Sequence, residues 1–181
     1  MLVVISGTHA SGKSTLISDF TSLHPEFEVL PDPYEMLDDE DVEPGADSFS
    51  AQLQLAAARL REPAPGVPRI AERGPLDFLA YLDALMSLRR PTRSPSLFRS
   101  GLATAVAAMA QVDLLVLLPL SEADHIEVPA DEDPELRSAM NESLLELADD
   151  PDLVGNAKVV EITGSPSHRL AQFEDAIESV S

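Results

Sequence analysis

Short apolar runs alternate with longer, partly polar segments along most of this chain. The clearest runs, at 1–5 and 112–118, are apolar at nearly every position and rich in Val, Ile and Leu. Such runs are typical of strands buried on both faces of a parallel sheet, whereas strands with one solvated face alternate apolar and polar positions. The sequence predicts strands at 1–5, 27–30, 69–72, 112–118 and 158–162.

The segments between the predicted strands have helical character. One of them begins with Pro75, which the first turn of a helix tolerates, and the prolines and glycine of 62–68 end the helix before it. The sequence predicts helices at 15–23, 50–61, 75–88, 102–110, 134–148 and 166–180, with an acidic loop at 38–47 and a basic connection at 89–100. This alternation predicts an α/β fold: a three-layer sandwich with a five-stranded parallel sheet and helices on both faces. A single domain, 1–181, is expected from the length.

Composition narrows the function classes. The net charge of −20 repels a phosphate backbone, so nucleic acid is not an expected partner. No apolar run approaches the roughly 20 residues that span a bilayer, so no membrane partner is expected. The chain has no cysteine, which excludes disulfides and thiolate metal sites. It starts directly on an apolar strand without a basic leader, and we expect a cytoplasmic protein.

One motif carries specific chemistry. Residues 7–14 read Gly-Thr-His-Ala-Ser-Gly-Lys-Ser and match G-x-x-x-x-G-K-[ST] between a predicted strand and a predicted helix. The glycines let the backbone approach phosphates closely, Lys13 supplies a charge to them, and Ser14 offers a hydroxyl to Mg²⁺. ATP and Mg²⁺ are therefore the expected cofactors, bound by Gly7, Thr8, His9, Ala10, Ser11, Gly12, Lys13, Ser14 and Thr15. His9 is expected to fill the loop without chemistry of its own.

Two further segments resemble a known family. Residues 72–77 read Glu-Arg-Gly-Pro-Leu-Asp at the end of a predicted strand. This resembles P-loop nucleoside kinases, and more closely the kinase domains related to nicotinamide riboside kinase. Residues 29–33 read Val-Leu-Pro-Asp-Pro, which is similar to the Glu-Pro pair of deoxynucleoside kinases. The resemblance spans most of the chain in order and spacing, and it implies a P-loop small-molecule kinase.

The resemblance also implies roles for single residues. Asp32 would accept the proton of the substrate hydroxyl, Glu72 would lie near Mg²⁺, and Arg73 would steady the reacting phosphate. All three follow predicted strands, where open α/β sheets bind ligands. Alternatives stay open: Asp32 as a turn residue with Glu35 as the base, or Glu72 and Arg73 as a structural ion pair. The predicted sets are Asp32, Lys13 and Arg73 for catalysis, Ser14 and Glu72 for the metal, and Asp32, Gln52, Glu72 and Arg73 for the substrate.

The strongest strand does not offer the metal an acid. Its Asp113 lies at the start of the strand and Pro119 follows its end, so Glu72 is the better candidate. No Asn-Lys-x-Asp segment that would read guanine occurs in the sequence, which disfavours a GTPase. Asp77 is interpreted as a charge in the first turn of the next helix, favourable to the helix dipole.

Residues that could choose the acceptor are less specific. The resemblance implies that a glutamine reads a base edge, and Gln52 and Gln54 are the candidates, each with a plain surface role as the alternative. Arg59 and Arg61 either reach the acceptor or pair with the acidic surface. The basic connection carries Arg89, Arg90, Arg93 and Arg99, which we interpret first as solvated ion pairs.

The predicted lid departs from the family. Residues 121–137 contain seven acids and one arginine, Arg137, where such kinases close an Arg-rich lid over the phosphates. Either Arg137 alone serves the donor phosphates, or the arginines of 89–99 substitute, or catalysis is slow. The resemblance also places the loop 162–166 against the adenine.

The resulting hypothesis is an ATP- and Mg²⁺-dependent phosphotransferase. Its partner would be a small molecule with a hydroxyl acceptor: a nucleoside, a relative such as nicotinamide riboside, or a natural product. The alternative is a nucleotide-binding regulatory ATPase that acts through a protein partner. The small residues of 102–110 would pack either in the core or against a second copy in a homodimer.

Overall fold

A computed structural model describes residues 1–36, 45–90, 93–121 and 132–180. Its centre is a five-stranded sheet in the order β2-β3-β1-β4-β5, and every neighbouring pair of strands is parallel. The prediction of a five-stranded parallel sheet is thereby confirmed. The strands are β1 (Leu2–Ser6), β2 (Glu28–Leu30), β3 (Arg69–Glu72), β4 (Leu114–Leu117) and β5 (Lys158–Glu161).

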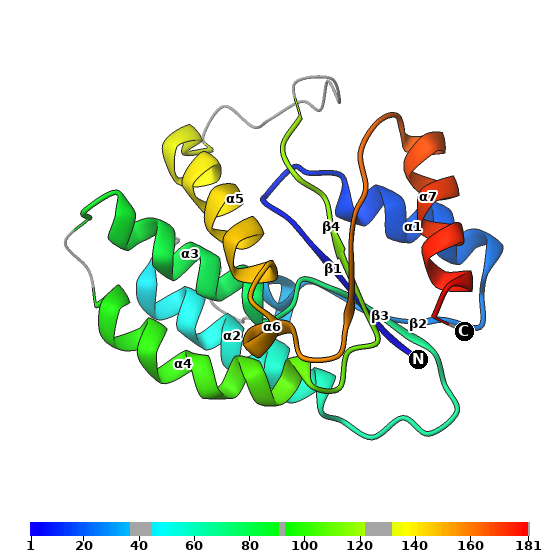
Figure 1. Ribbon diagram of the computed structural model, residues 1–181, viewed down its shortest axis with the longest axis horizontal. Coiled ribbons are helices and arrows are strands. Elements are labelled where there is room, and N and C mark those ends of the chain that lie inside the picture. Colours follow the sequence, from blue (N-terminus) through cyan, green and yellow to red (C-terminus); the bar gives the residue numbers. More distant parts are fainter. Residues whose placement is uncertain (37–44, 91–92, 122–131, 181) are drawn as a thin grey trace.

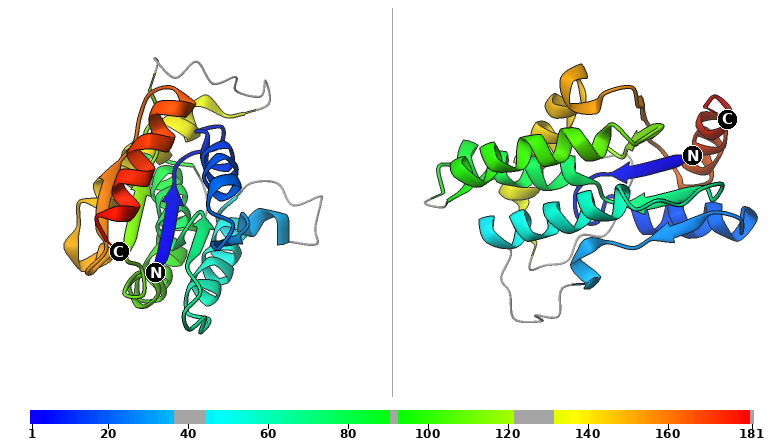
Figure 2. Two further views of the ribbon diagram at one scale, coloured as in Figure 1. Left: turned by 90° about the vertical axis from the view of Figure 1, so that its right-hand side faces the viewer. Right: turned by 90° about the horizontal axis from the view of Figure 1, so that it is seen from below.

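Helices cover both faces of this sheet. The helices are α1 (Lys13–Leu23), the 3-10 turn η1 (Pro33–Met36), α2 (Ala46–Leu60), α3 (Pro75–Ser87), α4 (Ser94–Met109), α5 (Pro134–Ala148), α6 (Pro151–Val154) and α7 (Pro166–Glu178). In Figure 1, α2 to α5 gather on one side of the strands, and α1 and α7 lie on the other. The views in Figure 2 agree with this arrangement, so the predicted three-layer sandwich is also confirmed.

The central strand shows why its sequence has no polar alternation. Leu2 and Val4 belong to the core beneath α2 to α5, whereas Val3 and Ile5 belong to the core beneath α1 and α7. Successive side chains of a strand point to opposite faces, so a strand between two helical layers needs apolar residues at every position.

Two helices begin four or more residues earlier than predicted. Helix α4 begins at Ser94 and not at 102, and α2 begins at Ala46 and not at 50. The Pro and Ser residues of 94–96 suggested a connection, but Pro95 lies in the first turn of α4, where a missing N–H costs nothing. Of the predicted acidic loop, 38–44 lies outside the described residues, as does 122–131 of the predicted lid.

The strand order sets the position of a site. Strand β1 lies between β3 and β4, so the chain winds outward from it in both directions. Open parallel sheets bind ligands where this reversal occurs, beyond the carboxyl ends of the strands. Within the described residues, no helix is long and apolar enough to span a membrane.

Candidate functional site

The loop between β1 and α1 closes tightly around its glycines. A Cβ on Gly7 would lie 2.6 Å from Ser11 Oγ and 2.9 Å from the carbonyl oxygen of Leu118, so only glycine fits there. Gly12 caps α1 in the left-handed conformation, with φ of 90°, which glycine adopts at little cost. The 7–14 segment therefore forms a compact loop that ends on a helix N-terminus, as an anion cradle requires.

Ser11 supplies independent support for a ligand in this cradle. The residue is 3% exposed, and its hydroxyl has no hydrogen-bond partner within the described part of the chain. Buried hydroxyl groups in folded proteins are almost always paired. A phosphate oxygen in the loop is a ligand of suitable chemistry for it, and the cradle thus fits the phosphates of a nucleotide.

Lys13 lies buried above the same loop. Its ammonium donates to the carbonyl oxygen of Thr8 at 2.8 Å. Burial lowers the pKa of Lys13 from 10.5 to about 7, and repulsion from Arg73 adds to this effect, while Asp77 and Glu72 oppose it. A polyanion beside Lys13 would restore the charged form, so the site is electrostatically suited to phosphates.

The side-chain oxygens of Ser14 and Glu72 lie next to each other. The hydroxyl of Ser14 donates to Glu72 Oε1 at 2.8 Å, which joins the start of α1 to the end of β3. No group of three or more His, Cys, Asp or Glu suited to a metal occurs among the described residues. Mg²⁺ is commonly held by one or two protein oxygens together with substrate phosphates. Ser14 and Glu72 could hold the metal in this way.

Asp32 and Arg73 meet beside this pair. Arg73 Nε donates to Asp32 Oδ2 at 2.7 Å, and the N–H of Tyr34 donates to Asp32 Oδ1 at 3.0 Å. Arg73 has a φ of 62°, a left-handed conformation that a non-glycine residue adopts at a cost and that is often found at functional sites. Burial opposes the charge of Arg73, but Tyr81 and Asp32 outweigh it and raise the pKa. The carboxylate therefore stays beside a permanent cation.

Asp77 does more than the sequence indicated. It does lie in the first turn of α3, where its carboxylate accepts the N–H of Gly74 at 2.8 Å. The same fully buried carboxylate accepts the Ser6 hydroxyl at 2.6 Å and the Gly7 N–H at 2.9 Å. Burial raises the pKa of Asp77, against the opposing effects of Arg73 and these three donors. Asp77 thus ties the start of the P-loop to α3.

Replacing Asp77 by Ala is expected to lower the free energy of unfolding by about 3 kcal/mol or more. Three buried donors would lose their acceptor, and each unsatisfied group costs about 1–3 kcal/mol. Urea denaturation measures the difference. Asp83→Ala is the matched control on the same helix, because within the described part of the chain Asp83 accepts one bond, from the Ser143 hydroxyl at 2.8 Å. Equal destabilisation by the two variants would contradict the role of Asp77.

Helix α2 forms a wall next to Asp32 and Arg73. Phe49 stacks on Tyr81, with ring centroids 4.4 Å apart. Arg73 also lies over the ring of Tyr81, with its guanidinium carbon 5.6 Å from the ring centroid. Further along α2, Arg59 donates to the carbonyl oxygen of Pro31, the residue before Asp32, at 2.6 Å. One face of α2 is therefore fixed against the segment that holds Asp32.

Gln52 lies on this face. It precedes Arg59 by seven residues, which is two helical turns. Its side chain is 5% exposed, yet the structure gives its amide no hydrogen bond within the described ranges. Gln54 and Arg61 are exposed. Among the described residues, Ser11 Oγ is the one fully buried side-chain polar atom without a partner, so the amide of Gln52 keeps some contact with solvent. Of the two candidate glutamines, Gln52 is the mostly buried one.

Arg137 lies at the P-loop, but it contacts the backbone. Its Nε donates to the carbonyl oxygen of His9 at 3.0 Å, and its Nη2 donates to that of Ala10 at 3.2 Å. The ring of His9 is exposed, in keeping with its interpretation as a loop filler.

Arg169 is a residue that the sequence did not indicate. It is 4% exposed, and it donates to the carbonyl oxygens of Ser11 at 2.6 Å and Gly164 at 2.9 Å. A single arginine in a C-terminal amphipathic helix carries no signal of such contacts, because its partners lie in distant loops.

The basic connection is engaged in ion pairs. Arg90 Nη2 lies 2.6 Å from Asp133 Oδ2, and Arg93 Nη1 lies 3.4 Å from Asp47 Oδ1. Partly exposed pairs of this kind contribute little to stability. They agree with the interpretation of this segment as a surface network.

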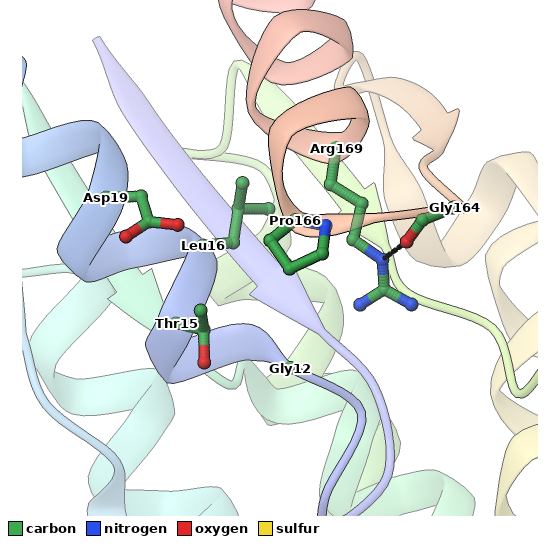
Figure 3. Close-up of a pocket in the computed structure, with 7 residues that line it drawn as sticks. All are labelled: Gly12, Thr15, Leu16, Asp19, Gly164, Pro166 and Arg169. Carbon is green, nitrogen blue, oxygen red and sulfur yellow. Dashed lines mark hydrogen bonds between the residues drawn. The ribbon is translucent and has the colours of Figure 1, made fainter. Parts of the chain in front are cut away.

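A small pocket adjoins the P-loop on the side of α7. Figure 3 shows α1 facing the loop after β5 across this pocket, and the cavity volume is about 100 Å³. Its position beside Gly12 puts the 162–166 loop next to the phosphate cradle. The lining residues are Gly12, Thr15, Leu16 and Asp19 from the first side and Gly164, Pro166 and Arg169 from the second.

Solved structures that resemble this chain in fold include two kinases. No protein-family model and no curated protein sequence matches the chain. Among solved structures, a thymidylate kinase from Candida albicans superposes with a TM-score of 0.70 at 18% identity, over 98% of this chain and 91% of that one. A deoxyadenosine kinase from M. mycoides with bound dATP gives 0.68 at 13% identity, over 98% and 100%.

A third neighbour, the NadR protein in complex with NR, gives a TM-score of 0.66 at 18% identity. It matches over 99% of this chain and 51% of that one. At such identities the likeness concerns the fold alone. The chain therefore has the fold of the P-loop nucleoside and nucleotide kinases.

Proposed function

We propose that this protein transfers the γ-phosphate of ATP, in the presence of Mg²⁺, to a hydroxyl group of a small molecule. The observation that carries the proposal is one cluster at the carboxyl ends of β1, β2 and β3. There the P-loop lies beside two separate carboxylates, each with its own hydrogen-bond donor: Glu72 with Ser14, and Asp32 with Arg73. Phosphoryl transfer needs mainly charge neutralisation and positioning, and this cluster supplies both.

On this proposal the P-loop holds the donor. Lys13 and the Ser11 hydroxyl would contact phosphate oxygens, while Ser14 and Glu72 would hold Mg²⁺. When bound, the metal neutralises charge on the β- and γ-phosphates. The unpaired Ser11 hydroxyl and the lowered pKa of Lys13 both support a polyanion at this position.

In this proposal Asp32 is the general base that accepts the proton of the acceptor hydroxyl. The oxygen of the acceptor hydroxyl attacks the γ-phosphorus, its proton passes to Asp32, and the bond from that phosphorus to the oxygen shared with ADP breaks. Arg73 orients Asp32 through the 2.7 Å bond and lies close enough to Lys13 to depress the pKa of that lysine, so it adds positive charge to the same site. Glu35, the other candidate base, is exposed on η1.

The wall of α2 supports an acceptor with an amide or a base edge. The amide of Gln52, a mostly buried residue, has donors and an acceptor to offer to a ligand. A nucleoside base or the carboxamide of nicotinamide riboside would pair with it. The deoxyadenosine kinase and NadR among the neighbours support the same class, whereas hydroxylated natural products lack a specific observation here.

A regulatory ATPase is the second candidate, and Arg137 favours it. This only arginine of the predicted lid is bonded to P-loop carbonyls, and acids dominate the rest of that segment. A kinase whose lid lacks a free cation would be slow, since such an arginine can contribute several orders of magnitude.

Gln52→Leu is expected to raise the KM of the acceptor by about tenfold or more and to leave the KM of ATP unchanged. The reason is that a hydrogen-bonding partner of the acceptor would be lost and a polar group of the bound acceptor left unpaired, at a cost of about 1–3 kcal/mol. Steady-state kinetics with each substrate varied in turn measures this. Gln54→Leu, on the exposed side of the same helix, is the control. An equal effect of both substitutions would remove Gln52 from the acceptor site.

The two candidate functions differ in how ADP release responds to an acceptor. ADP formation would be followed with Mg·ATP alone and after addition of nucleosides, nicotinamide riboside or hydroxylated antibiotics. A kinase is expected to release ADP faster with one acceptor class only. A slow rate that no acceptor changes would count against the kinase and for the regulatory ATPase.

A further inference from the structure

Two arginines hold three consecutive carbonyl groups of the P-loop. Arg137, from α5, holds those of His9 and Ala10, and Arg169, from α7, holds that of Ser11. Both helices lie far from the loop in the sequence, since the bonded residues are 127 to 158 positions apart. Ala10 also has a φ of 51°, so the loop contains a conformation that needs support from its surroundings.

These bonds fix the direction of the amide groups. In a trans peptide the carbonyl of one residue and the N–H of the next point in opposite directions. Carbonyls drawn toward the two guanidinium groups therefore turn the N–H groups of Ala10, Ser11 and Gly12 away from them. Backbone N–H groups of this loop are the groups that cradle phosphates. The arginines act on the cradle through the peptide planes.

Arg169 makes one additional connection. Besides Ser11, it holds the carbonyl of Gly164, which lies in the wall of the pocket next to α1 (Figure 3). Gly164 has a φ of 99°, so this wall turns in a conformation suited to glycine. Because Arg169 is 4% exposed, its guanidinium is a fixed bridge between the P-loop and that wall.

We propose that Arg137 and Arg169 are positioning residues that form a carbonyl clamp on the P-loop. Both aim N–H groups at the phosphates of the donor. Arg169 in addition sets the distance between the phosphate cradle and the pocket that would receive the nucleoside part of the donor. This inference rests on the proposed function, because it takes a nucleoside triphosphate as the ligand.

Two ligands distinguish the orientation of the N–H groups from the position of the pocket wall. Isothermal titration would compare Mg·ATP with Mg·tripolyphosphate, which has the phosphates without the nucleoside. Arg137→Gln is expected to weaken both ligands by the same factor, about tenfold, since the N–H groups bond a charged ligand. Arg169→Gln is expected to weaken ATP by about a further tenfold relative to tripolyphosphate, because the pocket wall is released as well.

Lysine variants distinguish orientation from charge. Arg137→Lys and Arg169→Lys keep the positive charge but cannot donate to two carbonyls through a planar fork. We expect neither to restore more than a small part of the lost affinity. Full restoration by Lys would overturn the clamp, because it would mean that the arginines act on the phosphates by charge alone.

Folding is checked by thermal unfolding of every variant. If Arg169→Gln does not fold, Arg169→Lys carries the test, with a selective loss of ATP affinity expected. An unchanged ratio of the two dissociation constants in folded Arg169 variants would overturn the role of Arg169, even though the wild type binds both ligands. Wild-type protein that binds neither ligand would contradict the proposed function itself, and with it the clamp.

Discussion

Lys13→Ala is expected to weaken Mg·ATP binding by about a hundredfold or more. The lysine is 4% exposed and lies over the loop whose carbonyl it contacts. It would bond two phosphates, and a hydrogen bond to a charged group contributes about 1.5–3 kcal/mol. Isothermal titration measures the change. Lys158→Ala is the control, because Lys158 is the other lysine of the chain and is exposed, bonded to the Ser179 hydroxyl at 2.7 Å.

The same substitution is not expected to destabilise the fold. Burial lowers the pKa of Lys13 from 10.5 to about 7, so between these values the unfolded chain binds more protons than the folded one. A charged lysine at this position thus costs stability at neutral pH, and stability rises as the pH increases from about 7. Lys13→Ala should keep or raise the free energy of unfolding at pH 7. Unchanged ATP affinity in this folded variant would contradict the assignment of the P-loop.

Asp32→Asn is expected to leave ATP binding intact and to lower the rate of transfer by about 10²- to 10⁴-fold. General base catalysis contributes an effect of that size, and an amide cannot take up the proton of the acceptor. Asparagine keeps the size of the side chain, and its single amide oxygen can still accept one of the two bonds, that of the Tyr34 N–H or that of Arg73. Single-turnover kinetics at saturating ATP measures the transfer step.

Glu35→Gln is the matched control for Asp32. It removes the other candidate base three residues away, on the exposed side of η1. A rate that falls in this variant and persists in Asp32→Asn would assign the proton to Glu35. If both variants keep the wild-type rate, neither acid is the base, and the contact between Asp32 and Arg73 is a structural ion pair.

Much of the fold could be predicted because buried parallel strands leave a local signal. Strand β3 and helix α5 have the predicted bounds. The start of α4 could not be predicted, because five of the residues 94–101 are Ser, Pro or Gly and weaken the local helical signal. Their helix packs closely against a neighbour: a Cβ on Gly101 would lie 2.9 Å from Leu53 of α2. Tertiary contacts of this kind override local composition.

In the site, too, the contiguous motif could be predicted and the contacts between distant residues could not. The P-loop is a contiguous motif with a fixed spacing, so its position could be predicted. The bond of Arg169 to Ser11 joins residues 158 apart, and the bond of Asp77 to Gly7 joins residues 70 apart. No periodicity or spacing encodes such pairs. Arg137 was predicted to serve the donor phosphates; its direct bonds in the structure are to the loop that would hold them.

The most direct test of the kinase is the product itself. Purified protein would be incubated with Mg·ATP and the panel of nucleosides, nicotinamide riboside and hydroxylated antibiotics, and acceptor masses would be measured by mass spectrometry, with Lys13→Ala in parallel. We predict that one acceptor class gains the mass of a single phosphate with the wild type and not with Lys13→Ala. ADP formation by the wild type without any phosphorylated acceptor would contradict the kinase proposal and favour the regulatory ATPase.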